Sequence, residues 1–126
     1  MHEFAISKTI LSHVKAYADA NNAEKVTEVF LKIGALRGMI SEWVERYFAY
    51  ASKGTNIEGA KVHINVVDGS VICNSCSNIM PIDRGNTPIK CSLCGGYGLK
   101  IRSGLEFDLL SICIIQKNEE RSENHA

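Results

Sequence analysis

The sequence predicts an α/β (α+β) fold, in which a small mixed three-stranded sheet and two helices accommodate an inserted cysteine-rich lobe. Two segments carry apolar residues at helical spacing, and three others have the alternating or continuous apolar pattern of strands. Two cysteine pairs lie between the second and third of these strands. We therefore expect an α/β domain at residues 1–70 and 105–116, and a lobe at 71–104.

The two predicted helices are amphipathic. The first begins almost at the first residue and ends near residues 21–22, with apolar side chains at helical spacing from Phe4 to Ala18. The second runs from Ile40 to Ala51 and has the most regular helical pattern in the sequence. Trp43 belongs to this apolar stripe, so we expect it in the core.

The three predicted strands differ in character. Apolar and polar residues alternate from Lys25 to Ile33 and again from Lys61 to Val67, as in half-buried strands. The third strand, Leu105 to Ile115, is apolar on both faces towards its end, which predicts a central strand. The remaining residues, 117–126, are polar, and we expect them to be a disordered tail.

The four cysteines of the lobe have the spacing of a zinc site. They form two Cys-x-x-Cys pairs, Cys73 with Cys76 and Cys91 with Cys94, and residues 77–90 separate the pairs. Each pair can place two thiolates on one edge of a metal, and two such edges complete a tetrahedron. Four protein sulfurs leave no coordination position for water or substrate, so such a site is structural.

Disulfide bonds and a redox dithiol are the alternatives to zinc. The lobe contains few large apolar side chains, and segments shorter than about 40 residues rarely fold without a metal or disulfides. Structural zinc contributes on the order of 10 kcal/mol in small metal-dependent folds. A contribution of that size is enough to decide whether the lobe is ordered.

Composition restricts the class of protein and its location. The 14 basic and 14 acidic residues cancel, which argues against a broad nucleic-acid surface. We see no secretory signal and no apolar run long enough for a membrane span. Paired cysteines without a signal indicate metal ligands in a reducing compartment, so we expect a soluble cytoplasmic protein.

The sequence contains no set of residues typical of an enzyme. We find neither a phosphate-binding P-loop nor a Ser-His-Asp or Cys-His-Asn series, so any nucleotide hydrolysis must come from a partner. The fifth cysteine, Cys113, shares a strand face with Leu105, Phe107 and Leu109, and we expect a buried free thiol there.

The N-terminal Met1-His2-Glu3 offers a second set of metal ligands. The α-amine of Met1, the amide nitrogen of His2 and its imidazole can chelate one ion in fused rings. This donor set favours a square-planar ion, Ni(II) or Cu(II), over zinc. Glu3 places a carboxylate beside it. By spacing alone the signal is weak, because a histidine at position 2 is usually incidental.

Further motifs make the chain resemble the HypA family of nickel metallochaperones. Besides the N-terminal triplet and the cysteine pairs, the motifs that carry the resemblance are Lys25-Val26-Thr27, Ile33-Gly34-x-Leu36-x-Gly38, Lys53-Gly54-Thr55 with Glu58-Gly59-Ala60, and Leu110-Ser111-Ile112. The resemblance covers residues 1–115. The sequence departs from the family pattern at Ala35, where a glutamate is common, and at Cys113, where an acidic residue often occurs.

The resemblance implies Ni(II) as the transferred metal, bound at Met1, His2 and Glu3, and Zn(II) as the structural metal. It also implies a HypB-type GTPase partner and delivery of nickel to the large subunit of nickel–iron hydrogenase; members of the family can also serve urease. We expect a monomer or weak homodimer that binds neither nucleic acid nor membrane. The alternative function is a zinc-ribbon module that binds nucleic acid or protein, with an incidental His2.

Overall fold

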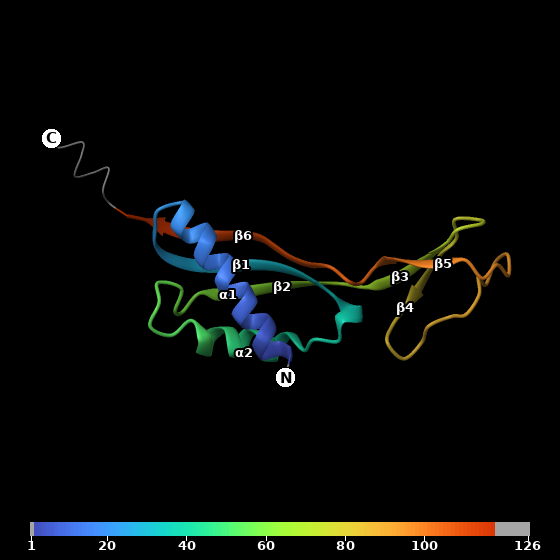
Figure 1. Cartoon of the computed structure of the whole chain (residues 1–126), viewed down its shortest axis with the longest axis horizontal. Coiled ribbons are helices and arrows are strands. Elements are labelled where there is room, and N and C mark those ends of the chain that lie inside the picture. The colour runs from blue at the N-terminus through green and yellow to red at the C-terminus, as the bar shows by residue number, and fades with distance from the viewer. Residues whose placement is uncertain (1, 118–126) are drawn as a thin grey trace. The chain divides into compact units, whose positions relative to one another are not determined.

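In the computed structural model, residues 2–117 are described, with side chains from residue 3 onward. The described residues form two α-helices and six strands (Figure 1). In chain order the elements are α1 (His2–Ala20), β1 (Ala23–Gly34), a 3-10 turn (Ala35–Arg37), α2 (Ser41–Ala51), β2 (Lys61–Val67), β3 (Gly69–Cys73), β4 (Ile79–Ile82), β5 (Leu99–Ser103) and β6 (Phe107–Gln116). The expected tail at 117–126 lies outside the described residues except for Lys117.

The strands form two sheets of three, with strand orders β2-β1-β6 and β4-β3-β5. The chain divides into two compact units. Within the described residues, the first unit comprises 2–31, 39–63 and 109–117, and the second comprises 32–38 and 64–108. The predicted fold class is therefore confirmed: two helices and a three-stranded sheet are interrupted by a cysteine-containing lobe.

The core of the first unit lies between its helices and β1. Val29 and Leu31 of β1 are buried, and so are Val14 of α1 and Phe48 of α2. The helices pack against each other, and the buried Ser7 hydroxyl donates a hydrogen bond of 3.0 Å to the carbonyl of Val44. Burial of these apolar side chains holds α1 against the rest of the unit.

Three expectations about this unit were wrong. The last strand, β6, is an edge strand, and β1 is central. Trp43 is 43% exposed, because Val44 and Phe48 alone fill the inward face of α2. Cys113 is exposed rather than buried. Two successive exposed residues, Leu110 and Ser111, break the alternation of β6 and move Cys113 to the outward face.

The second unit contains an antiparallel sheet that the sequence patterns did not predict. In the centre of this sheet, β3 pairs with β4 from Gly69 to Ile72 and with β5 from Ser70 to Cys73. Its small core comprises Val71, Cys73, Met80, Ile82 and Cys91, with Leu36 and Leu99 packed against it. Two of the five buried core residues are thus members of the cysteine pairs.

No helix in the described part of the chain is both long enough and apolar enough to span a bilayer.

Candidate metal centre

Each cysteine pair lies in a tight turn, and the two turns have the same backbone hydrogen bonds. In the first, the N–H of Ser77 donates to the carbonyl of Cys73 and the N–H of Cys73 donates to Asn78. In the second, Gly95 donates to Cys91, and Cys91 donates to Gly96. All four bonds are between 2.8 and 3.0 Å long.

The fifth position of each turn has a left-handed backbone. Ser77 has a φ of 65° and Gly95 a φ of 75°. This conformation curls the chain back so that both sulfurs of a pair face the same point. Gly95 adopts this conformation without strain, whereas Ser77 is sterically strained because it carries a Cβ. The two cysteine pairs are therefore two copies of one local structure.

The four sulfurs lie at the corners of a cluster that fits a tetrahedral metal. All four Sγ atoms are within 4.8 Å of one another. Cys73 and Cys94 have sulfurs 3.6 Å apart, and those of Cys76 and Cys91 are 3.7 Å apart. Metal–sulfur bonds of about 2.3 Å give a tetrahedron with edges of about 3.8 Å, whereas a disulfide bond measures about 2.05 Å. The geometry thus favours a shared metal over two disulfides.

One cysteine of each pair is buried and the other is exposed. Cys73 and Cys91 are 1% and 2% exposed, respectively, and both belong to the core of the lobe. Cys76 and Cys94 lie at the surface. The cluster therefore joins the interior of the lobe to its outer loop, so that any metal held there stabilises both.

Hydrogen-bond donors surround the sulfurs. Cys91 Sγ accepts from the N–H of Leu93 at 3.4 Å and from the side-chain amide of Asn78 at 3.6 Å. Cys94 Sγ accepts from the N–H of Gly96 at 3.4 Å. Such donors favour the thiolate over the thiol. Asn78 is a residue that sequence reasoning did not assign to the site, although its position directly after the first turn is a signal for it.

The thiols cannot all ionise without a cation. The backbone N–H groups of Cys94 and Leu93 lower the pKa of Cys91 to about 6, and those of Cys76 and Ser75 lower the pKa of Cys73. The backbone of Asn78 also lowers the pKa of Cys76, but burial and the neighbouring thiols raise it to about 12. A divalent cation removes this conflict, because it attracts all four thiolates.

Of the N-terminal triplet, the structure describes the backbone of His2 and the whole of Glu3, both in the first unit. Met1 and the side chain of His2 are outside the described residues, and the backbone of His2 begins α1. The residue Glu3 is 5% exposed, and its Oε2 accepts a hydrogen bond of 3.3 Å from the N–H of Ile40. Hydrogen bonds from its own backbone and from that of Ile40 hold the pKa of Glu3 below its usual value.

The other histidines are not part of a metal cluster in the described part of the chain, where the four cysteines are the one group of three or more suitable ligands. His13 is exposed on α1. His63 Nε2 lies 2.7 Å from the Glu28 carboxylate, and the His63 ring stacks on Phe30 with centroids 4.5 Å apart. These contacts between neighbouring strands give the His63 side chain a structural role without a metal.

The fold and the four-sulfur centre together define a small metal-binding protein with a ribbon-like lobe. Over residues 1–114 the sequence matches the family HypA, described as "Hydrogenase/urease nickel incorporation, metallochaperone, hypA". The chain belongs to the HypA family. That family consists of metallochaperones, which are not enzymes.

Similar proteins agree with this family. The chain is 34% identical to a hydrogenase maturation factor HypA from Caldanaerobacter subterraneus subsp. tengcongensis, over 89% of this chain and 97% of the relative. It is 38% identical to a hydrogenase maturation factor HypA from a Geobacter species, over 84% of this chain and 92% of the relative. The solution structure of the Ni metallochaperone HypA from Helicobacter pylori matches with a TM-score of 0.65 at 20% identity, covering 91% of this chain and 98% of that one. At that identity the structural match supports the fold alone.

Proposed function

We propose that this chain is a nickel metallochaperone that binds Ni(II) at Met1, His2 and Glu3 and delivers it to the large subunit of nickel–iron hydrogenase. The observation that carries the proposal is the family match over residues 1–114, with its description of nickel incorporation. Relatives that resemble the chain over most of their length bear the name hydrogenase maturation factor.

The start of α1 supports a nickel site at the terminus. His2 is the first residue of the helix, and the first four N–H groups of a helix have no partner within it. The amide of His2 is therefore available to a metal without loss of a helical hydrogen bond. A cation at this end opposes the helix dipole, but the buried carboxylate of Glu3 offsets part of that cost.

In this proposal Glu3 also fixes the geometry of the site. Its hydrogen bond from Ile40 ties the first turn of α1 to the residue before α2. A first helical turn anchored at Glu3 would reduce the conformational entropy lost when nickel binds beside it. A neutral imidazole and a deprotonated amide are required, so binding should weaken as the pH falls.

We further propose that the four-sulfur centre holds zinc and that the lobe at 71–104 depends on it. Four thiolates in a tetrahedron are the donor set that zinc prefers, and they leave no open position. When bound, zinc would supply charge neutralisation and cross-linking rather than catalysis. The residues that would hold it are Cys73, Cys76, Cys91 and Cys94.

The proposed partners follow from what the chain lacks. Its sequence has no phosphate-binding loop, so we propose that a partner GTPase, of the HypB type that the family resemblance implies, times the release of nickel. The family description also names urease, which makes urease maturation proteins a second set of recipients. Thiol ligands persist in a reducing compartment, which supports a cytoplasmic location. We expect a monomer or weak homodimer.

Nickel titration of two matched histidine variants tests the proposal. His2→Ala should weaken Ni(II) binding by at least about tenfold, or about 1.4 kcal/mol. His13→Ala, which changes an exposed histidine on the same helix, should leave it unchanged. Zinc content and the far-ultraviolet spectrum should be the same in both variants. Equal nickel affinities in both would remove the nickel role and favour a zinc-ribbon module instead.

A further inference from the structure

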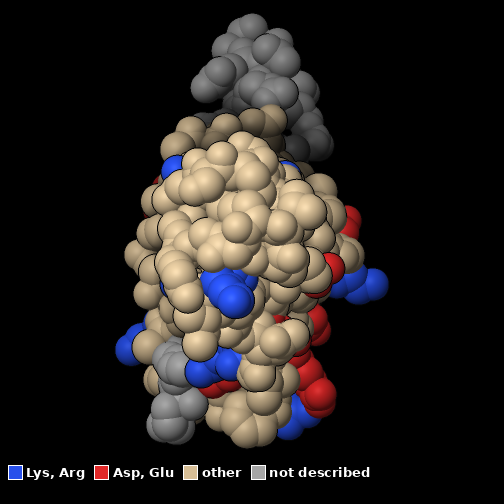
Figure 2. All heavy atoms as spheres, turned by 90° about the vertical axis from the view of Figure 1, so that its right-hand side faces the viewer, with Lys and Arg blue, Asp and Glu red and all other residues tan. Residues whose placement is uncertain are grey.

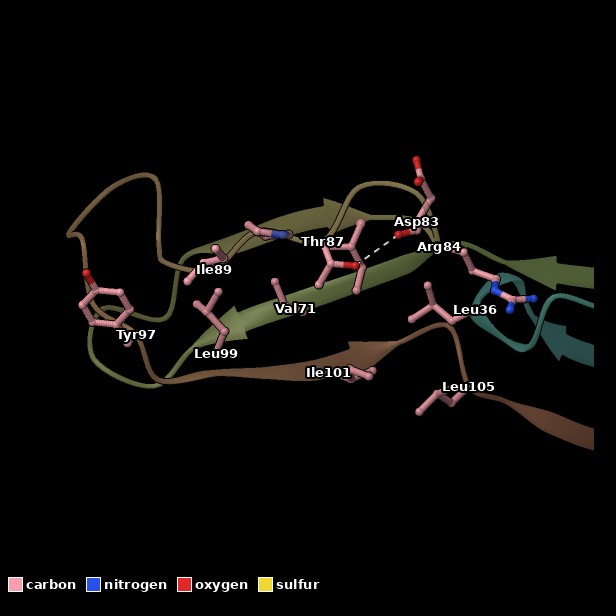
Figure 3. Close-up of a pocket in the computed structure, with 12 residues that line it drawn as sticks. Leu36, Val71, Asp83, Arg84, Thr87, Ile89, Tyr97, Leu99, Ile101 and Leu105 are labelled. Carbon is pink, nitrogen blue, oxygen red and sulfur yellow. Dashed lines mark hydrogen bonds between the residues drawn. The ribbon is translucent and has the colours of Figure 1, made fainter.

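An apolar groove with a volume of about 490 Å³ lies on one face of the lobe sheet. Figure 3 shows it between β5 and the loop that follows β4. Val71 forms part of its floor, and Ile101 lies on β5. Ile89 and Tyr97, both largely exposed, lie at one end beside Leu99 (Figure 3). We call this feature the lobe groove.

The groove borders an open sheet edge. The strand order β4-β3-β5 leaves β5 with a neighbour on one side only, within the described residues. An open edge presents unpaired N–H and C=O groups that can bind another strand. The opposite edge strand, β4, contains Pro81, which has no N–H to offer. The lobe sheet can therefore accept a further strand more readily at β5.

The two faces of β5 differ in character. Leu99 and Ile101 line the groove. Because side chains alternate along a strand, Lys100 and Arg102 lie on the other face. A strand added to β5 would thus place its alternate side chains in an apolar environment and the remaining ones next to two cations.

The charge around the groove has one predominant sign. Arg84 lines the groove, and Lys90 is the next residue in the chain after Ile89, which also lines it. With Lys100 and Arg102 on β5, four cations are present, and none forms an ion pair with another described residue. The carboxylate of Asp83 instead accepts from the backbone of Gly85 at 2.8 Å.

The cations of β5 select against a second copy of this chain. Two β5 strands paired antiparallel about Ile101 would bring Lys100 opposite Arg102 of the other copy, and like charges directly opposite are destabilising. A nucleic acid is also disfavoured, because the Lys and Arg side chains on the face shown in Figure 2 are separated by uncharged surface and do not form a continuous basic stripe.

We propose that the open edge of β5 and the lobe groove bind an extended segment of a partner protein in which apolar residues alternate with Asp or Glu. The apolar side chains enter the groove, and the carboxylates face Lys100 and Arg102. The segment pairs with β5 through its backbone, so recognition combines strand addition with alternating side-chain contacts. This inference does not depend on nickel.

A labelled synthetic peptide tests the proposal by fluorescence anisotropy with the full metal-loaded chain. The probe is about eight residues of alternating valine and glutamate, the length of an ordinary strand. Saturable binding below about 1 mM is expected. A peptide with the same composition in two blocks, and one that alternates valine with lysine, should bind at least about tenfold more weakly. Equal binding of all three peptides, or no saturable binding of the probe, overturns the proposal.

Two matched substitutions locate the site. Ile101→Ser should weaken binding of the probe by about tenfold, whereas Ile79→Ser should change it by less than about twofold. Ile101 is 49% exposed on β5 and Ile79 is 48% exposed on β4, so the substitutions remove similar surfaces from opposite edges. Equal effects of the two contradict a site at β5. Metal content per chain is measured for each variant.

A charge reversal gives a result that misfolding cannot produce. The double variant Lys100→Glu with Arg102→Glu should no longer bind the valine–glutamate peptide and should bind the valine–lysine peptide instead. Retention of the original preference overturns the assignment, and so does tighter binding of oligodeoxythymidine than of the probe to the native chain. His2→Ala should bind the probe as the native chain does, so that failure here and failure of the nickel proposal are distinguishable.

Discussion

Gly34 and Gly104 lie in such close backbone contact that no side chain can stand between them. A Cβ on Gly34 would lie 2.0 Å from the carbonyl carbon of Gly104. The contact is held by two hydrogen bonds, from Leu36 N to the Gly104 carbonyl and from Gly34 N to the Glu106 carbonyl, at 2.8 and 2.7 Å. The same contact joins the end of β1 to the chain leaving β5.

Three glycine-to-alanine variants should separate steric contact from backbone strain. Gly34 has an ordinary φ of −76°, but an added Cβ would clash with the backbone. Gly54 has a φ of 82°, and nothing lies within 4 Å of an added Cβ. Gly104 combines a φ of 113° with a clash. We expect the free energy of unfolding to fall by about 1 kcal/mol in Gly54→Ala and by about 3 kcal/mol in Gly34→Ala. The largest decrease should occur in Gly104→Ala. Urea denaturation measures the order, and a stable Gly34→Ala would contradict the close contact.

The metal centre should respond to single cysteine substitutions. Cys91→Ser removes a ligand that is also part of the lobe core, so metal should be lost and the β3–β5 sheet should lose amide-exchange protection. Cys113→Ser is the matched control and should keep one metal per chain, with four sulfurs at about 2.3 Å by X-ray absorption. A full metal complement in the Cys91 variant would refute the tetrahedral site.

Thiol alkylation should distinguish the fifth cysteine from the other four. Cys113 is exposed and lies outside the cluster, so it should react with iodoacetamide in the native protein. Metal-bound thiolates should react only after a chelator is added. Peptide mass spectrometry identifies the modified residue. Labelling of Cys76 or Cys94 before Cys113 would show that the cluster is not metal-bound.

Acid stability should depend on Glu106. Its own backbone N–H and that of Gly104 hold the pKa of the carboxyl below its usual value, with help from Lys32 and Arg37. A depressed pKa means that this carboxylate stabilises the fold above the unfolded value of about 4.3, and that the contribution is lost as the pH falls through the folded pKa. Glu106→Gln should therefore be less stable than the native chain at pH 7.

A pH series provides the check on that prediction. The stability difference between the native chain and Glu106→Gln should be constant at neutral pH and should shrink as the pH falls below about 4.3. Chemical denaturation at each pH measures it. A difference that does not change with pH would mean that the carboxylate charge has no part in the contact between Gly104 and Glu106.

The sequence predicted the local structures better than their surroundings. Periodicity located both helices, and cysteine spacing predicted the four-sulfur cluster, because these depend on residues close in the chain. Trp43 was misplaced because periodicity shows which residues share a stripe, not how wide the buried stripe is. Cys113 was misplaced because a break in strand alternation leaves no clear pattern in an apolar run.

The sheet of the lobe could not be predicted from the sequence, because its strands are too short to show a pattern. Its strands β3, β4 and β5 have only four or five residues each, too few for periodicity to show. Their pairing depends on the two cysteine turns and on the Gly34–Gly104 contact, which bring distant segments together. Asn78 was missed as a sulfur partner because its role follows from the turn and not from its residue type.

Nickel titration of the native chain against a chain whose α-amine is acetylated tests the central claim most directly. Acetylation changes no side chain, but it removes the amine as a donor that chelates together with the amide and imidazole of His2. We predict a loss of at least about tenfold in nickel affinity, with zinc content unchanged. Equal affinities, within about twofold, would contradict a nickel site at the N-terminus.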